Sequence, residues 1–255
     1  MTDIRVSLKK SLGPFWRWTI NLGVGNCEVG CVYCYNRRWE WADKKWVSKT
    51  DLSLFRKQVS KFVWEPGECK QYSGNWDIMM SSTGDPFSDS NIRTATEVLR
   101  LVSRADVGRH LRVLSKVYNE FGAEVLENSV PQDSLYGVTI TTLNNEIEQI
   151  LQPGASSHSE LVNMIGKMME SGLKTWISSE PMFVGMNLYE LASYIEDTYG
   201  SLPTEWWVGR LNIRGDTPTI ARTFRMDDRK IVQKFSYARD SFPDIAWFLK
   251  KEVVG

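Results

Sequence analysis

The sequence predicts an α/β fold, a partial (β/α)6 barrel of the TIM type, formed by a single domain over residues 1–255. Short apolar runs alternate with amphipathic stretches, which is the pattern of βα units with a parallel sheet. The chain of 255 residues also has the length of one such barrel. Three cysteines follow the first apolar run, and barrels carry their active residues on the loops after the strands. We expect the barrel core over residues 15–212 and a helix-and-strand extension over 213–255.

The predicted strands are short runs of apolar, β-branched or aromatic residues, as buried parallel strands require. The runs DIMMSS and YGVTITT show this pattern most clearly. In chain order, the predicted strands cover residues 15–22, 77–82, 111–115, 136–142, 174–179, 206–211 and 245–249.

Helices are predicted where apolar residues recur every three or four positions. The clearest helix follows a capping box of Ser157 and Glu160. Its methionine-rich stripe is interpreted as core, and another helix starts after the cap candidates Asp89 and Ser90. The predicted helices cover residues 51–62, 92–102, 120–128, 161–169, 188–199 and 228–239.

Composition places the chain among globular proteins, because 42% of its residues are hydrophobic and 24% are charged. The first residues contain no apolar stretch typical of a signal peptide, and no run approaches the roughly 20 apolar residues of a membrane span. We therefore expect a cytoplasmic protein without a membrane partner. The net charge is zero, yet residues 1–70 carry an excess of +6 and the remainder −6. Such asymmetry is compatible with a polyanionic or acidic partner and equally with an ordinary solvated surface.

The most informative motif is NCEVGCVYCYN, which holds Cys27, Cys31 and Cys34 at the spacing C-x3-C-x2-C. Three thiolates this close in sequence can hold three irons of a [4Fe–4S] cube, because Cys thiolates are the ligands of such clusters. The fourth iron then lacks a protein ligand and can bind a small molecule.

A zinc site is the main alternative for the same cysteines. Structural zinc needs four closed ligands, and the candidates for the fourth are Cys69, His110 and His158. None of these belongs to a second paired motif such as a downstream CxxC, so the sequence offers no second pair of zinc ligands. A disulfide framework is disfavoured, since four cysteines in 255 residues are sparse.

The cysteine motif resembles that of the radical S-adenosylmethionine (SAM) enzymes. In that family the open iron binds the amino and carboxylate groups of SAM, and an electron from the cluster cleaves SAM to release a 5′-deoxyadenosyl radical. The resemblance implies a lyase or oxidoreductase with two cofactors, a [4Fe–4S] cluster and SAM. It also implies an electron donor of the flavodoxin or ferredoxin type.

Residues at the ends of the predicted strands could contact SAM. Near the cluster, Tyr33 is expected beside the adenine. The loop TGDPF follows the second strand, and the resemblance implies that such a loop binds the SAM amino group. Lys116 ends the third strand and could pair with the SAM carboxylate. Simple β-propensity explains the threonines of the fourth strand equally well. The expected cofactor contacts are Tyr33, Thr83, Gly84, Asp85, Ser115, Lys116 and Thr139.

The segments NCEVGCVYCY, TGDPF, VLSK, VTITT, QPGAS and SSEPM, in this order, resemble the branch that contains spore photoproduct lyase. The resemblance spans residues 19–212. It breaks at the end of the second strand, where those lyases use a cysteine as hydrogen donor and this chain has Ser81 and Ser82. A serine O–H bond is too strong to donate a hydrogen atom to a carbon radical. Cys69 could replace the donor only if its loop folded over the barrel mouth.

The substrate stays open between two classes. The segment NRRWEWADKKW, residues 36–46, interleaves basic and aromatic residues, which suits stacked bases and phosphates. Alternatively, its tryptophans pack a helix against the barrel and its charges are solvated. A nucleic acid is one candidate substrate, and a small metabolite or peptide is the other. A zinc-stapled binding module is the non-enzymatic alternative.

Overall fold

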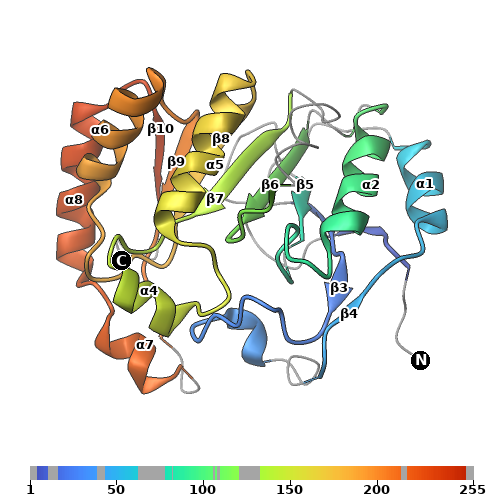
Figure 1. Ribbon diagram of the computed structural model, residues 1–255, viewed down its shortest axis with the longest axis horizontal. Helices are drawn as coiled ribbons and strands as arrows, with labels where there is room; N and C mark the ends of the chain where they lie inside the picture. Colours follow the sequence, from blue (N-terminus) through green and yellow to red (C-terminus); the bar gives the residue numbers. More distant parts are fainter. Residues whose placement is uncertain are drawn as a thin grey trace. The chain divides into compact units, whose positions relative to one another are not determined.

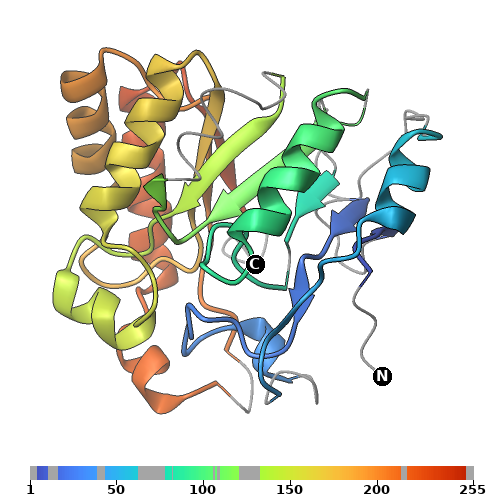
Figure 2. The same ribbon diagram turned by 45° about the vertical axis from the view of Figure 1, so that its right-hand side comes forward.

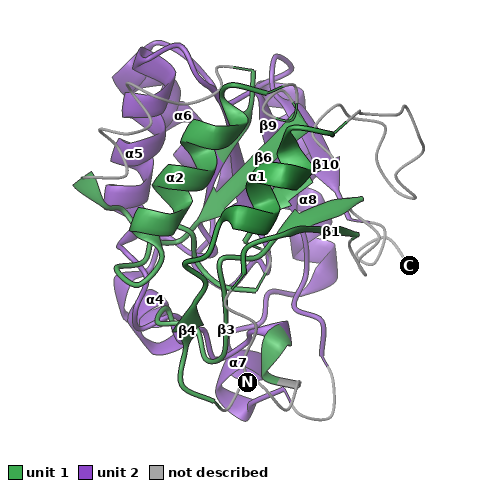
Figure 3. Cartoon of the chain, turned by 90° about the vertical axis from the view of Figure 1, so that its right-hand side faces the viewer, with its two compact units in different colours: residues 1–29, 36–136 green, residues 30–35, 137–255 purple. Residues whose placement is uncertain are grey.

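The computed structural model of the protein describes residues 5–10, 17–38, 44–62, 78–81, 83–105, 107, 110–120, 133–213 and 217–250. The chain divides into two compact units, residues 1–29 with 36–136 and residues 30–35 with 137–255 (Figure 3). The first border lies inside the cysteine motif and the second inside a strand. The single domain over residues 1–255 stays a prediction.

The first unit contains four neighbouring strands in the order β1 (Leu8–Lys10), β2 (Trp18–Ile20), β5 (Ile78–Met80) and β6 (Leu111–Ser115). Strand β1 runs antiparallel to β2, whereas β2, β5 and β6 are parallel. All three residues of β5 are buried. This burial is the reason that its sequence shows a continuous apolar run instead of alternation.

The first unit also contains two helices, a pair of very short strands and part of a 3₁₀ helix. Helix α1 (Ser53–Val59) contacts β1 and α2 (Ile92–Val102). The two-residue strands β3 (Gly23–Val24) and β4 (Val47–Ser48) pair antiparallel. The 3₁₀ helix η1 (Tyr35–Arg38) begins in the second unit and continues in the first.

The second unit contains the parallel strands β8 (Lys174–Ser179), β9 (Glu205–Val208) and β10 (Ala246–Leu249). Strand β7 (Leu135–Thr139) enters this unit at Gly137, and beyond its end Ile140 N–H donates to Ser178 O at 3.0 Å.

Five helices belong to the second unit's described residues: α4 (Asn145–Leu151), α5 (His158–Glu170), α6 (Leu188–Tyr199), α7 (Thr219–Thr223) and α8 (Asp228–Ser241). Helix α5 packs on β8, and α6 packs between α5 and α8 (Figures 1 and 2). The predicted capping box is confirmed, because Ser157 Oγ accepts from Glu160 N–H and the Glu160 carboxylate accepts from Ser157 N–H at 2.8 Å.

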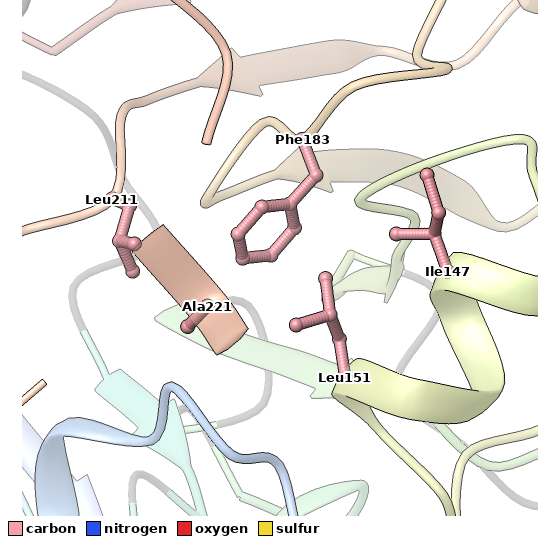
Figure 4. Close-up of a cluster of buried hydrophobic side chains, with 5 residues drawn as sticks. All are labelled: Ile147, Leu151, Phe183, Leu211 and Ala221. Carbon is pink, nitrogen blue, oxygen red and sulfur yellow. The ribbon is translucent and has the colours of Figure 1, made fainter. Parts of the chain in front are cut away.

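A buried hydrophobic cluster joins α4 and α7 to the segments after β8 and β9 in the second unit. The ring of Phe183 lies in its middle (Figure 4). The partly buried Val32, Tyr33 and Phe224 pack against this cluster. The buried members are Ile147, Leu151, Phe183, Leu211 and Ala221.

Most predicted elements are confirmed with ends shifted by a few residues. The helix over 92–102 starts after Asn91, one residue beyond the predicted caps. The helix predicted at 120–128 falls almost wholly outside the described residues. Strands β1, β3 and β4 and helices α4 and α7 were not predicted. In the part of the chain that the structure describes, the helices are too short or too polar to cross a bilayer.

Candidate functional site

The three motif cysteines are divided between the two units. Cys27 belongs to the first unit, whereas Cys31 and Cys34 belong to the second. Cys34 N–H donates to Cys31 O at 3.1 Å, so these two residues share one tight turn. No disulfide involves any of the three, and Cys31 is the most buried of them.

The donor set fits an iron–sulfur cluster by its chemistry. Three thiols lie within one short loop, and soft thiolates are the ligands that Fe–S clusters prefer. Within the described residues, no three His, Cys, Asp or Glu side chains are gathered closely enough to form a preassembled metal centre. This holds for an iron–sulfur cluster and for zinc alike, and Cys69 lies outside the described residues.

Tyr33 is fixed on two sides within the second unit. Its hydroxyl donates to Gln152 Oε1 at 2.7 Å, and its ring lies 5.1 Å from that of Phe183, centroid to centroid. Burial raises the pKa of Tyr33 well above its ordinary value, and the thiols of Cys31 and Cys34 raise it further. The phenol therefore keeps its proton and acts as a hydrogen-bond donor.

The carboxylate of Asp85 organises the loop after β5. Its Oδ1 accepts from Ser115 Oγ at 2.7 Å and from Phe87 N–H at 3.0 Å, and its Oδ2 accepts from Lys116 N–H at 2.6 Å. Only 6% of Asp85 is exposed. These bonds tie the loop to the carboxyl end of β6, so the carboxylate shapes the loop from inside. A SAM contact by Asp85 stays a prediction.

Asn91 closes the same loop from the start of α2. Its Nδ2 donates to Asp85 O at 2.7 Å, and its Oδ1 accepts from Trp46 Nε1 at 3.2 Å. The predicted caps are Asp89 and Ser90, but Asn91 occupies the N-cap position of α2. The Asn91 side chain makes no cap hydrogen bond and braces the loop instead.

The indole of Trp46 occupies a slot between two glycines. A Cβ at Gly23 or at Gly84 would overlap the ring atoms of Trp46. The Trp46 Nε1–H also lies 3.1 Å from Ser48 Oγ. This tryptophan therefore packs against Gly23 and Gly84 while its side chain stays partly exposed.

Ser81 directly follows β5 and has a left-handed backbone conformation, with φ of 57°. This backbone region is costly for a residue with a side chain. The cost is offset locally, since Ser81 N–H donates to Ile20 O at 2.6 Å and Ser81 Oγ donates to Gly84 O at 2.7 Å. The hydroxyl at the predicted donor position is therefore used to close the turn. Ser82 lies outside the described residues.

The remaining predicted contacts lie near strand ends. Thr83 Oγ1 donates to Gly23 O at 3.3 Å, and Thr83 O accepts from Asn36 Nδ2 at the same distance. Lys116 directly follows β6 and is partly buried. Thr139 is the last residue of β7 and is 2% exposed. The SAM contacts of these residues stay predictions.

The QPGAS and SSEPM segments contain charged and polar groups that the sequence analysis did not assign. Glu180 follows β8, and its Oε2 pairs with Lys250 Nζ at 2.6 Å. Gln152 accepts a hydrogen bond from the Tyr33 hydroxyl. Glu148 lies on α4, one helical turn before Gln152. The helical signal at Asn144, Ile147 and Leu151 could have revealed α4, but no local pattern reveals the bond to Tyr33.

Three basic residues of the segment over residues 36–46 have exposed side chains. Arg37, Lys44 and Lys45 are exposed, whereas Trp46 is packed as described above. Trp39, Trp41 and Cys69 lie outside the described residues. Of the tryptophans in this segment, the structure describes Trp46, which packs against Gly23 and Gly84.

Comparison with sequences gives one distant relative. No protein-family model matches the sequence. The uncharacterised protein ORF301 of Acidianus two-tailed virus is 24% identical over 177 residues, which are 65% of this chain and 56% of that protein. The chain thus aligns with little more than half the length of this relative.

Solved structures give a stronger likeness in the fold. A cysteine-to-serine mutant of spore photoproduct lyase has a TM-score of 0.70 at 13% identity, over 96% of this chain and 79% of that one. A double mutant of spore photoproduct lyase with bound AdoMet and dinucleoside spore photoproduct scores 0.66 at 12% identity, over 94% and 78%. SuiB of Streptococcus suis scores 0.51 at 10% identity, over 68% and 39%. The predicted fold class is confirmed: the protein is mixed α/β with mostly parallel strands, and it has the partial-barrel fold of these radical SAM enzymes.

Proposed function

We propose that the protein is a radical SAM enzyme that cleaves SAM reductively and uses the 5′-deoxyadenosyl radical to abstract a hydrogen atom from its substrate. The observation that carries the proposal is the C-x3-C-x2-C motif after β2, in a chain whose fold matches spore photoproduct lyase over 96% of its length. Neither observation alone would suffice, because a fold does not determine a function.

Cys27, Cys31 and Cys34 would hold three irons of a [4Fe–4S] cluster. When bound, the cluster supplies one electron that splits SAM into methionine and the radical, and a flavodoxin- or ferredoxin-like protein replaces that electron. The chain's own contribution is to position the cofactors and exclude water.

The loop after β5 would receive the SAM amino group through backbone carbonyls of Thr83 and Gly84, while Asp85 and Ser115 hold the loop in shape. Carbonyl oxygens carry two lone pairs, so a carbonyl that already accepts one bond can accept another. Lys116 would pair with the SAM carboxylate, Thr139 would contact the ribose, and Tyr33 would lie beside the adenine.

The first test of this proposal is anaerobic reconstitution with iron and sulfide. We expect about four irons per chain, as one [4Fe–4S] cluster requires. With dithionite as reductant, 5′-deoxyadenosine should form even without a substrate. Cluster-loaded protein that forms none would refute the radical chemistry. Protein that takes up zinc and shows no visible cluster absorbance would favour the zinc-stapled binding module.

For the substrate we propose a nucleic acid. Support comes from the neighbouring structures, three of which contain a dinucleoside spore photoproduct, and from the exposed Arg37, Lys44 and Lys45. The zero net charge and the packed Trp46 favour the second candidate, a small metabolite or peptide.

Binding of single- and double-stranded oligonucleotides over a salt series distinguishes the two substrates. If phosphates carry the affinity, it should fall steeply as salt rises. The double variant Arg37→Ala, Lys44→Ala should flatten the logarithmic slope by about one unit per lost contact. The matched control is Arg229→Ala, Lys230→Ala, which removes the same charge from exposed positions near the start of α8. Absence of binding at low salt would discard the nucleic-acid candidate.

A further inference from the structure

A chain of four polar side chains runs from the cysteine loop to the start of α5, entirely within the second unit. Tyr33 donates its hydroxyl proton to Gln152 Oε1 at 2.7 Å. Gln152 Nε2 donates to Glu148 Oε1 at 3.3 Å. The second carboxylate oxygen, Glu148 Oε2, accepts from His158 N–H at 3.1 Å and lies 3.2 Å from His158 Nδ1.

The middle of this chain is buried and its far end reaches the surface. Gln152 is 1% exposed and Glu148 is 4% exposed, whereas 21% of the His158 side chain is exposed. A buried carboxylate requires hydrogen-bond donors. Glu148 finds them in Gln152 and in the first turn of α5, whose positive end favours an anion.

Position 152 needs a group that accepts and donates at the same time. A Gln amide does both, because its oxygen accepts from the phenol while its nitrogen donates to the carboxylate. Glutamate at 152 would repel Glu148, and leucine would leave both Tyr33 and Glu148 without this partner. The amide orientation follows from these two neighbours.

The loop is docked to the end of α4 by a second, independent bond. Val32 N–H donates to Leu151 O at 2.9 Å, so two adjacent loop residues bind two adjacent helix residues. The Tyr33 ring also packs on Phe183 of the hydrophobic cluster. The turn that carries Cys31 and Cys34 is thus held through the residues between them.

We infer that Gln152, itself oriented by Glu148, is a positioning residue that fixes Tyr33 and thereby sets the conformation in which Cys31 and Cys34 are presented. This inference rests on the proposed function for its purpose, since the cluster gives the presented thiols their role. The inference assigns a role to Gln152, the first residue of the QPGAS segment, that follows neither from the cysteine spacing nor from the fold.

The test measures alkylation of Cys31 in cluster-free protein by mass spectrometry. Gln152→Leu should speed this reaction about fivefold, as the loss of one ordinary hydrogen bond raises the open fraction of the loop. Tyr33→Phe removes the same bond together with the contacts of the hydroxyl to Cys31 and Thr141, so its effect should be at least as large. The double variant should be no faster than Tyr33→Phe alone, because Gln152 acts on the loop through the Tyr33 hydroxyl.

The matched control is Asn187→Ala, which removes the N-cap bond of α6 to Glu190 N–H and touches nothing in the loop. It should leave Cys31 alkylation at the wild-type rate. A wild-type rate in Gln152→Leu and in Tyr33→Phe would overturn the inference. If wild-type protein binds no cluster and Gln152→Leu still accelerates alkylation, the proposed function fails and the positioning role stands. After reconstitution, the two variants should also alter the EPR spectrum of the reduced cluster, while Asn187→Ala should not.

Discussion

Alanine in place of Cys27, Cys31 or Cys34 should abolish cluster binding and 5′-deoxyadenosine formation. Each thiolate is proposed as the ligand of one iron, and the loop offers no spare cysteine nearby. We expect iron content after reconstitution to fall from about four per chain to below about one, because an incompletely ligated cluster is labile. Iron analysis, visible absorbance and product chromatography measure this outcome.

Cys69→Ala is the matched control for the cysteine variants. It removes a thiol outside the motif, so iron content and SAM cleavage should match wild type. Full iron loading of Cys27→Ala would show that the proposed ligand set is wrong. Loss of the cluster in Cys69→Ala would instead make Cys69 a ligand and reopen the zinc-like four-ligand interpretation.

Asp85→Asn should destabilise the folded protein strongly. An asparagine amide would place its NH2 group against a backbone N–H, since Lys116 N–H and Phe87 N–H approach the two carboxylate oxygens separately. Leaving buried donors unsatisfied costs about 3 kcal/mol in the free energy of unfolding. For a chain of this size, that corresponds to a fall in Tm of about 10 °C.

The stability gap between wild type and Asp85→Asn should depend on pH. Burial raises the pKa of Asp85 more than its hydrogen bonds to Lys116, Ser115 and Phe87 lower it. The folded state therefore binds the proton more tightly than the unfolded state. The Asp85 contribution to stability is complete below the unfolded pKa and is lost as pH rises through the raised folded pKa. The difference in free energy of unfolding between wild type and Asp85→Asn should thus be largest at acid pH and should decrease as pH rises. Thermal unfolding of both proteins across a pH series measures this difference.

Asp89→Asn is the matched control, because Asp89 lies in the same segment and is exposed. A surface change of this kind should alter stability by less than about 0.5 kcal/mol. Equal Tm values for wild type and Asp85→Asn would mean that Asp85 does not brace the loop. The carboxylate would then be available for the SAM amino group.

The parallel strands could be predicted because their burial leaves a local record in the sequence. Strand β5 is short, yet its two-sided burial makes the residues IMM stand out from their polar surroundings. The capping box at Ser157 and Glu160 is likewise local, since its partners are three positions apart. The cysteine motif belongs to the same kind of signal, as its spacing alone indicates the chemistry.

Features that depend on distant partners could not be predicted. Strands β3 and β4 are two residues each, too short for any periodicity, and they form only when Gly23 meets Ser48. The Tyr33–Gln152 bond joins residues 119 positions apart. The internal bonds of Asp85 could not be predicted either, because donors such as Lys116 N–H are backbone groups that occur along the whole chain.

The slot around Trp46 has a consequence for how this chain can change over evolutionary time. Gly23 and Gly84 touch the same indole, so the three positions are thermodynamically coupled. A larger residue at Gly84 becomes tolerable only after the indole is replaced by a smaller side chain, whereas a Cβ at Gly23 would also lie 2.9 Å from Val47 O. The order of substitutions is therefore constrained: in divergent homologues a larger residue at position 84 should occur only together with a smaller one at position 46.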